Sequence, residues 1–525
     1  MRGAPHCVAR HQSDLDPGLL VTILQKGRLA VGLSRAPHLS DTEVGQHMMT
    51  GSSLMSRWIT SLPVQVALVF LLLAVGACSD DAGPTGPGVE IEPAIPAAAT
   101  AWLQDNVHTF ESADPSENME DLAFLQELVG DARVVALGEA THGTQEFQQM
   151  KDRIVRYLVR EMRFDALAME VSWPEANRMD SYVRSGVGEP ETLQAGLYFF
   201  LARTQEVLDM IGWMRSSNAT GTPVGFYGFD MQYPGMAIET VERFLAATDS
   251  SVVTEVAARL DCLRPYANTP TSYPPEFYDA APPEYRDACH EDLTWVHDAL
   301  AARQEDLSAL GGTESFQRTL RSARVLVQFE EMSSGRQSRD DAMAENALWL
   351  LDQLGPDGKL ILWAHNEHIA TNRDRMGQRL REALGDDLVS IGFTFARGYF
   401  NAVLTSGSHT YGLQELSAEL PPDDSYEAYF LSTRMPRLAL DLRDRPFASD
   451  SSAWLHGPLL HRLIGATYDR NHAEAYFYLT DLTQDFDATI FFVDTTASTI
   501  LVLPRPETFF PYGFGDGWGA NRGGL

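Results

Sequence analysis

The chain has 525 residues, enough for roughly two to four domains. It carries 72 acidic against 40 basic side chains, a net charge of −32, with no basic run in its body, which argues against nucleic-acid binding. Hydrophobic residues make up 44% and aromatic residues 10% of the chain, so it can bury a large core and is not disordered throughout.

One long apolar run, Val64–Ala77, lies near the N-terminus and follows Arg57. It is shorter than the roughly 20 residues that a membrane-spanning helix needs. Its charged start, apolar middle and small residues at the end are typical of a secretory signal. The run ends at Cys78 in a sequence that resembles a bacterial lipoprotein box. We therefore expect a signal peptide at 55–77 and an extracytoplasmic protein held to the membrane only by a lipid on Cys78; a true membrane span is the alternative.

The segments around this signal have no pattern of a packed domain. Residues 1–54 are predicted to be a non-structural leader, or the result of a misplaced translation start. Residues 78–98 are rich in Pro, Gly and Ala and predict a flexible tether. The catalytic domain is expected at 99–505, followed by a Gly- and aromatic-rich tail at 506–525. The candidate true starts are Met48, Met49 and Met55.

Two cysteines remain for the folded part once Cys7, in the leader, and Cys78 are set aside. Cys262 and Cys289 flank a segment rich in Pro and Tyr, which is typical of a surface loop. In an oxidising compartment we expect a disulfide that closes this loop. Two buried free thiols are the alternative.

Short apolar runs alternate with helical patterns along the folded part. We therefore predict an α/β fold with a central, mostly parallel sheet flanked by helices. Helical periodicity covers Thr144–Met162, and a second helix opens near Pro174, where proline suits the first turn. The four strands expected to lead into polar residues are Arg133–Leu137, Phe164–Met169, Val224–Phe229 and Leu360–Trp363. Further strand-like runs are Leu388–Phe395, Phe400–Leu404, Ala475–Leu479 and Thr489–Val493.

A long helical stretch separates the third and fourth of these strands. It includes Glu291–Gln304, Ser315–Glu331 and Arg339–Leu354. We predict that residues from about 235 to 355 form a helical subdomain inserted over the C-terminal ends of the strands.

Polar residues follow all four of the first strands. Because ligands bind beyond the carboxyl ends of parallel strands in open α/β sheets, one shared site is the simplest interpretation. Independent capping and turn residues are the alternative. The residues at the four strand ends are Glu139 and His142 after the first, Glu170 after the second, Asp230 after the third, and His365, Asn366 and His368 after the fourth.

Within this site His142 is the candidate general base. We expect it to be exposed beside a helix N-terminus, where the local positive potential keeps imidazole neutral and able to accept a proton. Glu139 or Glu170 would accept the other ring N–H and stabilise the charge that develops. The sequence has no G-x-S-x-G nucleophile elbow, so water is the expected nucleophile.

The other polar residues have expected roles around that chemistry. His365 and His368 would polarise the carbonyl group of the substrate. Asp230, Arg339, Asn366 and Arg153 are predicted to bind substrate; for Arg153, a place at the rim of the core is the alternative.

This mechanism needs no cofactor, but two other functions stay open. His and carboxylate side chains are suitable zinc ligands, so the same cluster could instead hold a divalent metal in a metal-dependent hydrolase. A lipid-anchored binding protein that has lost turnover is the third hypothesis.

Four segments together resemble the erythromycin esterase family over roughly residues 100–505: GEATHGTQEF, FYGFDMQ, SRDDAMAENALWLL and LILWAHNEHIA. The resemblance implies an α/β core with a helical part that forms a deep cleft, and hydrolysis of a macrolide lactone ester by histidine-activated water. It places the family's GE-x-x-HG residues on Glu139 and His142, its next glutamate on Glu170, and its W-A-H-N-x-H histidines on His365 and His368. It also implies a small-molecule ester substrate and a link to antibiotic resistance. The lipoprotein-like leader departs from the resistance enzymes of this family, which are typically cytoplasmic.

Overall fold

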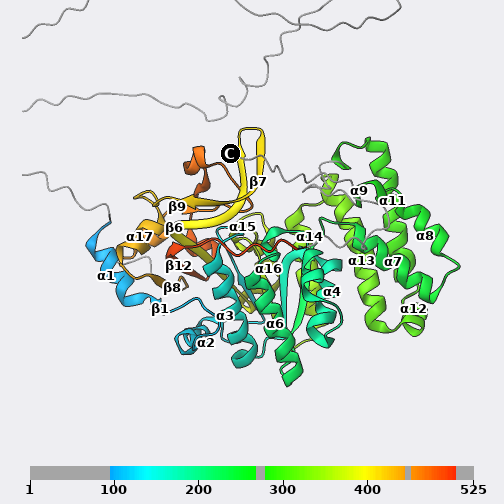
Figure 1. Cartoon of the computed structure of the whole chain (residues 1–525), viewed down its shortest axis with the longest axis horizontal. Coiled ribbons are helices and arrows are strands. Elements are labelled where there is room, and N and C mark those ends of the chain that lie inside the picture. The colour runs from blue at the N-terminus through cyan, green and yellow to red at the C-terminus, as the bar shows by residue number, and fades with distance from the viewer. Residues whose placement is uncertain (1–94, 268–277, 444–450, 504–525) are drawn as a thin grey trace, which may run out of the picture. The chain divides into compact units, whose positions relative to one another are not determined.

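A ten-stranded sheet organises the computed structural model, which describes residues 95–267, 278–443 and 451–503 (Figure 1). The strand order is β1-β8-β12-β6-β2-β5-β3-β4, with β7 and β10 also paired to β6. All pairs from β12 to β4 along this order are parallel, and β1, β7 and β8 pair in antiparallel fashion, so the predicted mostly parallel sheet is confirmed. The strands are β1 (His108–Thr109), β2 (Val134–Leu137), β3 (Ala166–Ser172), β4 (Gly225–Asp230), β5 (Leu360–Trp363), β6 (Leu388–Ser406), β7 (His409–Ala418), β8 (Arg437–Asp441), β9 (Leu459–Arg462), β10 (Thr467–Tyr468), β11 (Phe477–Thr480) and β12 (Ala488–Thr495).

Helices cover both faces of the sheet, and the strand sequences show why. Val134 and Ala136 of β2 point into one hydrophobic core, whereas Val135 and Leu137 point into the other. Because side chains alternate along a strand, a strand that is apolar throughout needs a helical layer on each side. Helices α14 (Arg339–Gln353), α16 (Met376–Leu384) and α17 (Tyr426–Ser432) contribute to the first core, and α2 (Phe124–Val129), α3 (Gln145–Met162), α4 (Trp173–Ser185) and α6 (Gln205–Thr220) contribute to the second.

Further helices precede β1, lie between strands of the sheet, or form the insertion between β4 and β5. They are α1 (Ala97–Asn106), α5 (Pro190–Ala195), α7 (Gly235–Thr248), α8 (Val253–Leu260), α9 (Arg264–Ala267), α11 (Pro283–Ala301), α12 (Gln304–Gly311), α13 (Thr313–Ser333), α15 (Asn366–Ile369), α18 (Leu482–Asp485) and the short 3-10 helix η3 (Phe200–Ala202).

The first four predicted strands are confirmed to within two or three residues at each end. Two later predictions differ. The runs Leu388–Phe395 and Phe400–Leu404 are one continuous strand, β6, whose exposed residues around Tyr399 break the apolar pattern where the strand leaves the core to pair with β7. The run Ala475–Leu479 is only partly a strand, β11, and it pairs with β9 in a separate two-stranded sheet.

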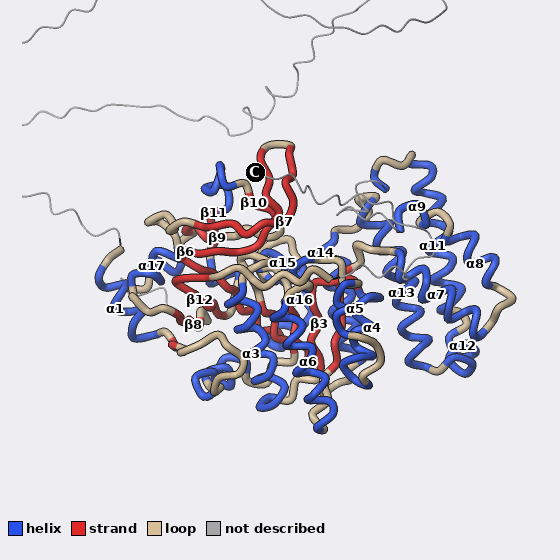
Figure 2. The backbone as a smooth tube through the Cα atoms, viewed as in Figure 1, coloured by secondary structure: helices blue, strands red, loops and turns tan. Residues whose placement is uncertain are grey.

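The predicted helical insertion is present, but it does not lie over the strand ends. Helices α7, α8, α9, α11, α12 and α13 pack on one another and contact the core through α4 and α14, so they stand beside the β4 edge of the sheet (Figures 1 and 2). The last predicted member, α14, packs instead against β4, β5 and α16 and belongs to the α/β core. The insertion has this position because it begins directly after β4, the strand at the edge of the described sheet.

A disulfide joins Cys262 and Cys289, as predicted, and ties the end of α8 to α11 within the insertion. The Pro/Tyr-rich segment between them is not entirely a loop, because α9 and the first turns of α11 lie in it. Pro283 is the first residue of α11, a position where its fixed φ and missing N–H are tolerated.

Several predictions fall outside the described residues: the leader at 1–54, the signal peptide at 55–77, Cys78 and the tail at 506–525. The predicted tether at 78–98 overlaps the described part only at its end, where α1 already begins at Ala97. Among the helices of the described ranges, none has both the length and the hydropathy required to cross a membrane.

Candidate active site

The C-terminal ends of four adjacent parallel strands supply one cluster of polar side chains. His142 follows β2, Glu170 lies near the end of β3, where the pairing with β4 shifts register, and His365 follows β5. The His142 and His365 rings are 5.3 Å apart between centroids, and the backbone N–H of His365 donates to Glu170 Oε2 at 2.9 Å. The expectation of a single cluster at the strand ends therefore agrees with the geometry.

His142 is held by a buried carboxylate. Its Nδ1 lies 2.6 Å from Glu139 Oε1, so Nδ1–H donates to the carboxylate and Nε2 is left to accept a proton. Glu139 Oε2 accepts hydrogen bonds from Lys151 Nζ at 2.6 Å and from Trp363 Nε1 at 2.9 Å. His142 is 8% exposed rather than open to solvent, because the Phe200 ring and the backbone of Gly465 lie against it.

The ion pair of Glu139 and Lys151 is entirely inside the protein. Burial raises the pKa of the Glu139 carboxyl, but Lys151 and the hydrogen bond from His142 outweigh it and hold that pKa below its ordinary value. Burial lowers the pKa of Lys151 to about 8, although Glu139 opposes the shift. Glu139 is therefore ionised at neutral pH and can stabilise a positive charge that develops on His142.

A second group of charges is centred on Arg339, the first residue of α14. Its Nη2 donates to Glu170 Oε1 at 2.8 Å and to Asp230 Oδ2 at 2.7 Å, and its Nη1 lies 3.1 Å from His368 Nε2. Burial alone would raise the pKa of Glu170, but His368 and Arg339 hold it well below the ordinary value. Arg339 thus connects the ends of β3 and β4 with the helix α15.

His368 lies between two carboxylates. Its Nδ1 is 2.7 Å from Asp340 Oδ1, and its Nε2 is 3.4 Å from Glu170 Oε1. Burial lowers the pKa of His368, but Glu170 and Asp340 outweigh it and raise the pKa to about 9. His368 is therefore a cation at neutral pH.

This shift predicts a pH-dependent contribution to stability. The folded-state pKa of His368 is about 9 and its ordinary value is 6.5, so the contribution is complete below pH 6.5 and is lost as the pH rises through 9. The expected size is about 3 kcal/mol at most, since one pKa unit corresponds to about 1.4 kcal/mol. Urea unfolding of the wild type and of His368→Asn at pH 6 and pH 9.5 measures it: the wild type should lose more stability than the variant. Equal losses would contradict the assignment.

His365 has the opposite character. Burial, followed by the charges of His142 and His368, lowers its pKa to about 3, so it stays neutral. The backbone N–H of Glu367 donates to His365 Nδ1 at 3.3 Å, which puts the ring proton on Nε2. That Nε2–H has no hydrogen-bond partner among the described residues. It is a donor available for an oxygen atom of a ligand.

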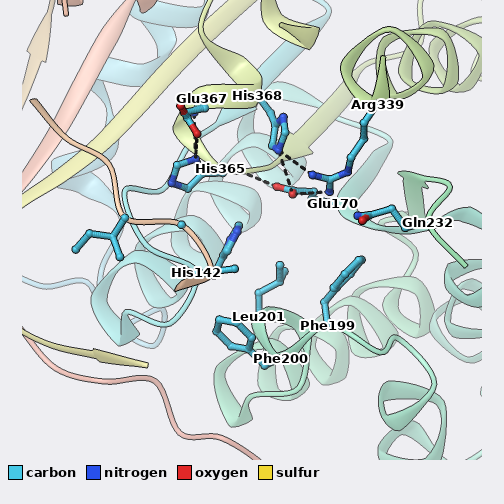
Figure 3. Close-up of a pocket in the computed structure, with 13 residues that line it drawn as sticks. His142, Glu170, Phe199, Phe200, Leu201, Gln232, Arg339, His365, Glu367 and His368 are labelled. Carbon is cyan, nitrogen blue, oxygen red and sulfur yellow. Dashed lines mark hydrogen bonds and ion pairs between the residues drawn. The ribbon is translucent and has the colours of Figure 1, made fainter. Parts of the chain in front are cut away.

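A pocket of about 240 Å³ opens over these groups (Figure 3). Phe199, Phe200 and Leu201 line one side, and the charged groups around Arg339 and Glu170 line the other. His142 lies between the two sides and points toward the space. The full lining is His142, Glu170, Phe199, Phe200, Leu201, Gln232, Arg339, His365, Glu367, His368, Ile464, Gly465 and Ala466.

Three of the predicted substrate-binding residues do not reach this pocket. Arg153 lies on α3 and binds the carboxylate of Asp121 and two backbone carbonyls, so it has the alternative role at the rim of the core. Asn366 is fully buried and exchanges two hydrogen bonds with the backbone of Phe393. Asp230 is also buried, and it orients Arg339. Arg339 itself lines the pocket.

Several residues of the site were not predicted from the sequence. Lys151 is one of three lysines in a chain that otherwise uses arginine for its cationic side chains, and it lies on the buried face of α3. A buried lysine needs a partner of opposite charge, so this position could have been recognised from the sequence as part of a site. The apolar wall around Phe200 and the Ile464–Ala466 segment gave no local signal, because each comes from a distant part of the chain.

The ion pairs of Glu139 and Glu170 also affect whether the site can bind a metal ion. The described ranges contain no group of three or more His, Cys, Asp or Glu side chains placed to hold a metal ion. The two carboxylates that would be the natural ligands, Glu139 and Glu170, are each bonded to a cationic side chain, Lys151 and Arg339. These cations would compete with a metal for the same oxygen atoms.

Comparison with known proteins identifies the family. The model of the erythromycin esterase family matches residues 159–495. The chain belongs to the erythromycin esterase family. The family is one of esterase-like hydrolases, and the match begins after the segment that holds Glu139 and His142.

Relatives and solved structures agree with this membership of the erythromycin esterase family. An erythromycin esterase type II from Escherichia coli is 24% identical over 347 residues, which cover 60% of this chain and 81% of that protein. The Bacillus subtilis protein "Putative hydrolase YbfO" is 23% identical over 388 residues, covering 68% and 84%. A Bacillus cereus crystal structure is 26% identical with a TM-score of 0.67, covering 77% of this chain and 98% of that one. A mutant of the erythromycin esterase EreC in its open conformation shares the fold at 19% identity and a TM-score of 0.56, covering 75% and 98%.

Proposed function

We propose that the protein hydrolyses a carboxylic ester with a water molecule activated by His142. The observation that carries the proposal is the His142–Glu139 pair at the pocket: a buried, ionised carboxylate fixes Nδ1–H and leaves Nε2 facing the cavity. This is the arrangement of a general base whose developing charge is stabilised. Membership of the erythromycin esterase family supports the same reaction class.

The reaction then needs one proton carrier and one oxyanion donor. His142 Nε2 takes a proton from water, and the hydroxide oxygen bonds to the carbonyl carbon, whose π electrons move to the carbonyl oxygen. The Nε2–H of His365, which has no hydrogen-bond partner in the described part of the chain, can donate to that oxyanion, and His368 adds positive charge nearby. When the tetrahedral intermediate collapses, the C–O bond to the alcohol breaks and the alkoxide takes the proton back from His142.

The pocket also constrains what part of a substrate it holds. Its volume of about 240 Å³ is below the roughly 300–1,000 Å³ of pockets that enclose a drug-sized ligand. We propose that the ester group and its nearest atoms enter between Phe200 and His368, while the rest of a large substrate, such as a macrolide, stays outside. A macrolide lactone is the first candidate, and a smaller ester is the second.

Mass spectrometry of erythromycin and of simple esters such as p-nitrophenyl acetate, incubated with the full chain, tests the proposal. A gain of one water on the macrolide, absent with His142→Ala, would support a macrolide esterase. Turnover of another ester alone would keep the mechanism and replace the substrate. If no ester is hydrolysed, the proposed function is wrong and a binding-only protein becomes the better hypothesis.

Exhaustive chelation distinguishes this mechanism from metal-dependent hydrolysis. Because Lys151 and Arg339 occupy the two carboxylates, we expect ester turnover to be unchanged after dialysis against a strong chelator. The same samples with zinc or manganese added back are the control. Loss of turnover on chelation that one of these metals restores would favour the metal-dependent hydrolase.

We also propose that the protein works outside the cytoplasmic membrane, attached by a lipid on Cys78. The disulfide between Cys262 and Cys289 supports an oxidising compartment. Labelling of the full chain in bacterial cells with a fatty-acid analogue, with Cys78→Ser as control, tests the attachment. Equal labelling of the two chains would contradict it.

A further inference from the structure

The segment Ile464–Ala466 forms a wall of the pocket although it comes from a distant part of the chain. The N–H groups of Ile464 and Gly465 donate to the carbonyl of Ala140 at 2.8 and 3.3 Å, and the N–H of His142 approaches the carbonyl of Gly465 at 3.5 Å. Gly465 has a left-handed backbone with φ of 68°. This segment therefore lies against the turn that carries the proposed base.

The residues just before this segment are held by one buried carboxylate. Glu427 Oε1 accepts hydrogen bonds from Thr394 Oγ1 at 2.5 Å, from His461 Nδ1 at 2.9 Å and from the backbone N–H of Arg462 at 3.0 Å. Glu427, His461 and Thr394 are all almost completely buried. The pKa of Glu427 stays below its ordinary value because His461 and these hydrogen bonds outweigh burial, so the carboxylate is charged.

The hydrogen bonds of Glu427 connect two strands that belong to different sheets. His461 and Arg462 end β9, which pairs with β11 in a separate two-stranded sheet, whereas Thr394 lies in β6 of the central sheet. Glu427 therefore links β9 to β6 through side chains, whereas on the other side of the wall the chain is held to β6 by the short parallel ladder of β10. Arg462 adds to this link, since its Nη2 donates to the carbonyls of Ala396 at 3.0 Å and Glu419 at 2.7 Å.

We propose that Glu427 is a positioning residue for the reaction: through His461 and Arg462 it holds the Ile464–Ala466 wall against His142. The inference rests on the proposed hydrolysis for its effect on turnover, but not for its effect on the wall. Because a displacement of about 1 Å at a catalytic group costs about 100-fold in rate, loss of this link should reduce turnover although Glu427 does not touch the substrate.

The contacts of Glu427 suggest two variants, one that keeps the hydrogen-bond acceptor and one that removes it. Only Oε1 makes hydrogen bonds; Oε2 has no partner among the described residues. Glu427→Gln can keep the accepting oxygen and place its NH₂ at the unbonded position, whereas Glu427→Ala removes the acceptor. Thr394→Val, which removes one of the three donors, is a milder variant in case Glu427→Ala fails to fold.

A matched control exists in the helical insertion. Glu330 is also buried and accepts from a histidine, with Oε2 2.8 Å from His290 Nδ1, but α13 contributes no residue to the pocket lining. Glu330→Ala should lower the melting temperature without changing the kcat for the ester.

The four variants and the wild type, as full chains, would be compared by ester kinetics and by hydrogen exchange of the amides at 463–467. We expect Glu427→Ala to exchange faster there and to lose about 10- to 100-fold in kcat, with a smaller change in KM. Thr394→Val should change both in the same direction but less, and Glu427→Gln should stay within about threefold of the wild type.

Two results would overturn the inference: unchanged exchange at 463–467 in Glu427→Ala and Thr394→Val, or a loss of kcat in Glu330→Ala as large as that in Glu427→Ala. If the wild type hydrolyses no ester, the proposed function fails, and the exchange measurement alone still decides whether Glu427 positions the wall.

Discussion

Replacement of His142 by alanine is expected to reduce kcat for the ester by at least about 100-fold while the protein stays folded, since general bases contribute roughly 100- to 10,000-fold. The size follows from the geometry. Nδ1 is hydrogen-bonded to Glu139 at 2.6 Å, and the ring lines the pocket, so Nε2 is left for a ligand. No other histidine in the described pocket lining combines a carboxylate on one ring nitrogen with an available second nitrogen. His365 has Nδ1 occupied by the backbone of Glu367, and His368 is charged.

His290→Ala is the matched control for this experiment. Its Nδ1 also meets a buried glutamate, Glu330, at 2.8 Å, but the pair lies in the helical insertion between α11 and α13. Circular dichroism and thermal unfolding of both variants would show that each is folded. A folded His142→Ala protein that keeps more than a tenth of the wild-type kcat would contradict the role assigned to His142.

The strand-end cluster could be predicted because local sequence determines it. A strand such as Leu360–Trp363 is apolar throughout, and the change to polar residues marks where it leaves the sheet. Parallel neighbours end at the same edge, so the sequence alone was enough to group Glu139, His142, Glu170 and His365. A strand pattern does not predict which charged side chains form ion pairs with one another at that edge of the sheet.

Arg153 and Asn366 are two residues whose partners the sequence did not predict. Both are polar residues close in sequence to the site, and both turn to other partners, Asp121 and the backbone of Phe393. Conversely, Lys151 lies only two residues from Arg153 on α3 and yet binds Glu139, and the Ile464–Ala466 segment belongs to the site although it comes from a distant part of the chain. Nearness in sequence to the strand ends is therefore a poor guide to which residues line the pocket. Side-chain direction and long-range packing decide the lining.

Replacement of Lys151 by methionine is expected to lower the free energy of unfolding by about 3–5 kcal/mol, the usual cost of removing one partner from a buried ion pair. Methionine keeps the length of the side chain beside Trp363 but leaves the Glu139 carboxylate without its cation. Burial then raises the pKa of Glu139 with less opposition. With a higher pKa, Glu139 is protonated over more of the acid range and no longer stabilises a charged His142 there, so the acid limb of the kcat profile should move to higher pH.

The double variant Glu139→Gln/Lys151→Met separates stability from catalysis. Because both charges are removed together, much of the lost stability should return, whereas the activity should not, since the anion beside His142 is gone. Urea unfolding and the pH dependence of kcat would be measured for the two single variants and the double. Arg243→Met, which breaks an exposed pair on α7, should cost less than about 1 kcal/mol. If Lys151→Met proves no more costly than Arg243→Met, or if the double variant recovers full activity, then Glu139 does not depend on Lys151 for its charge and the base at His142 is aligned by another group.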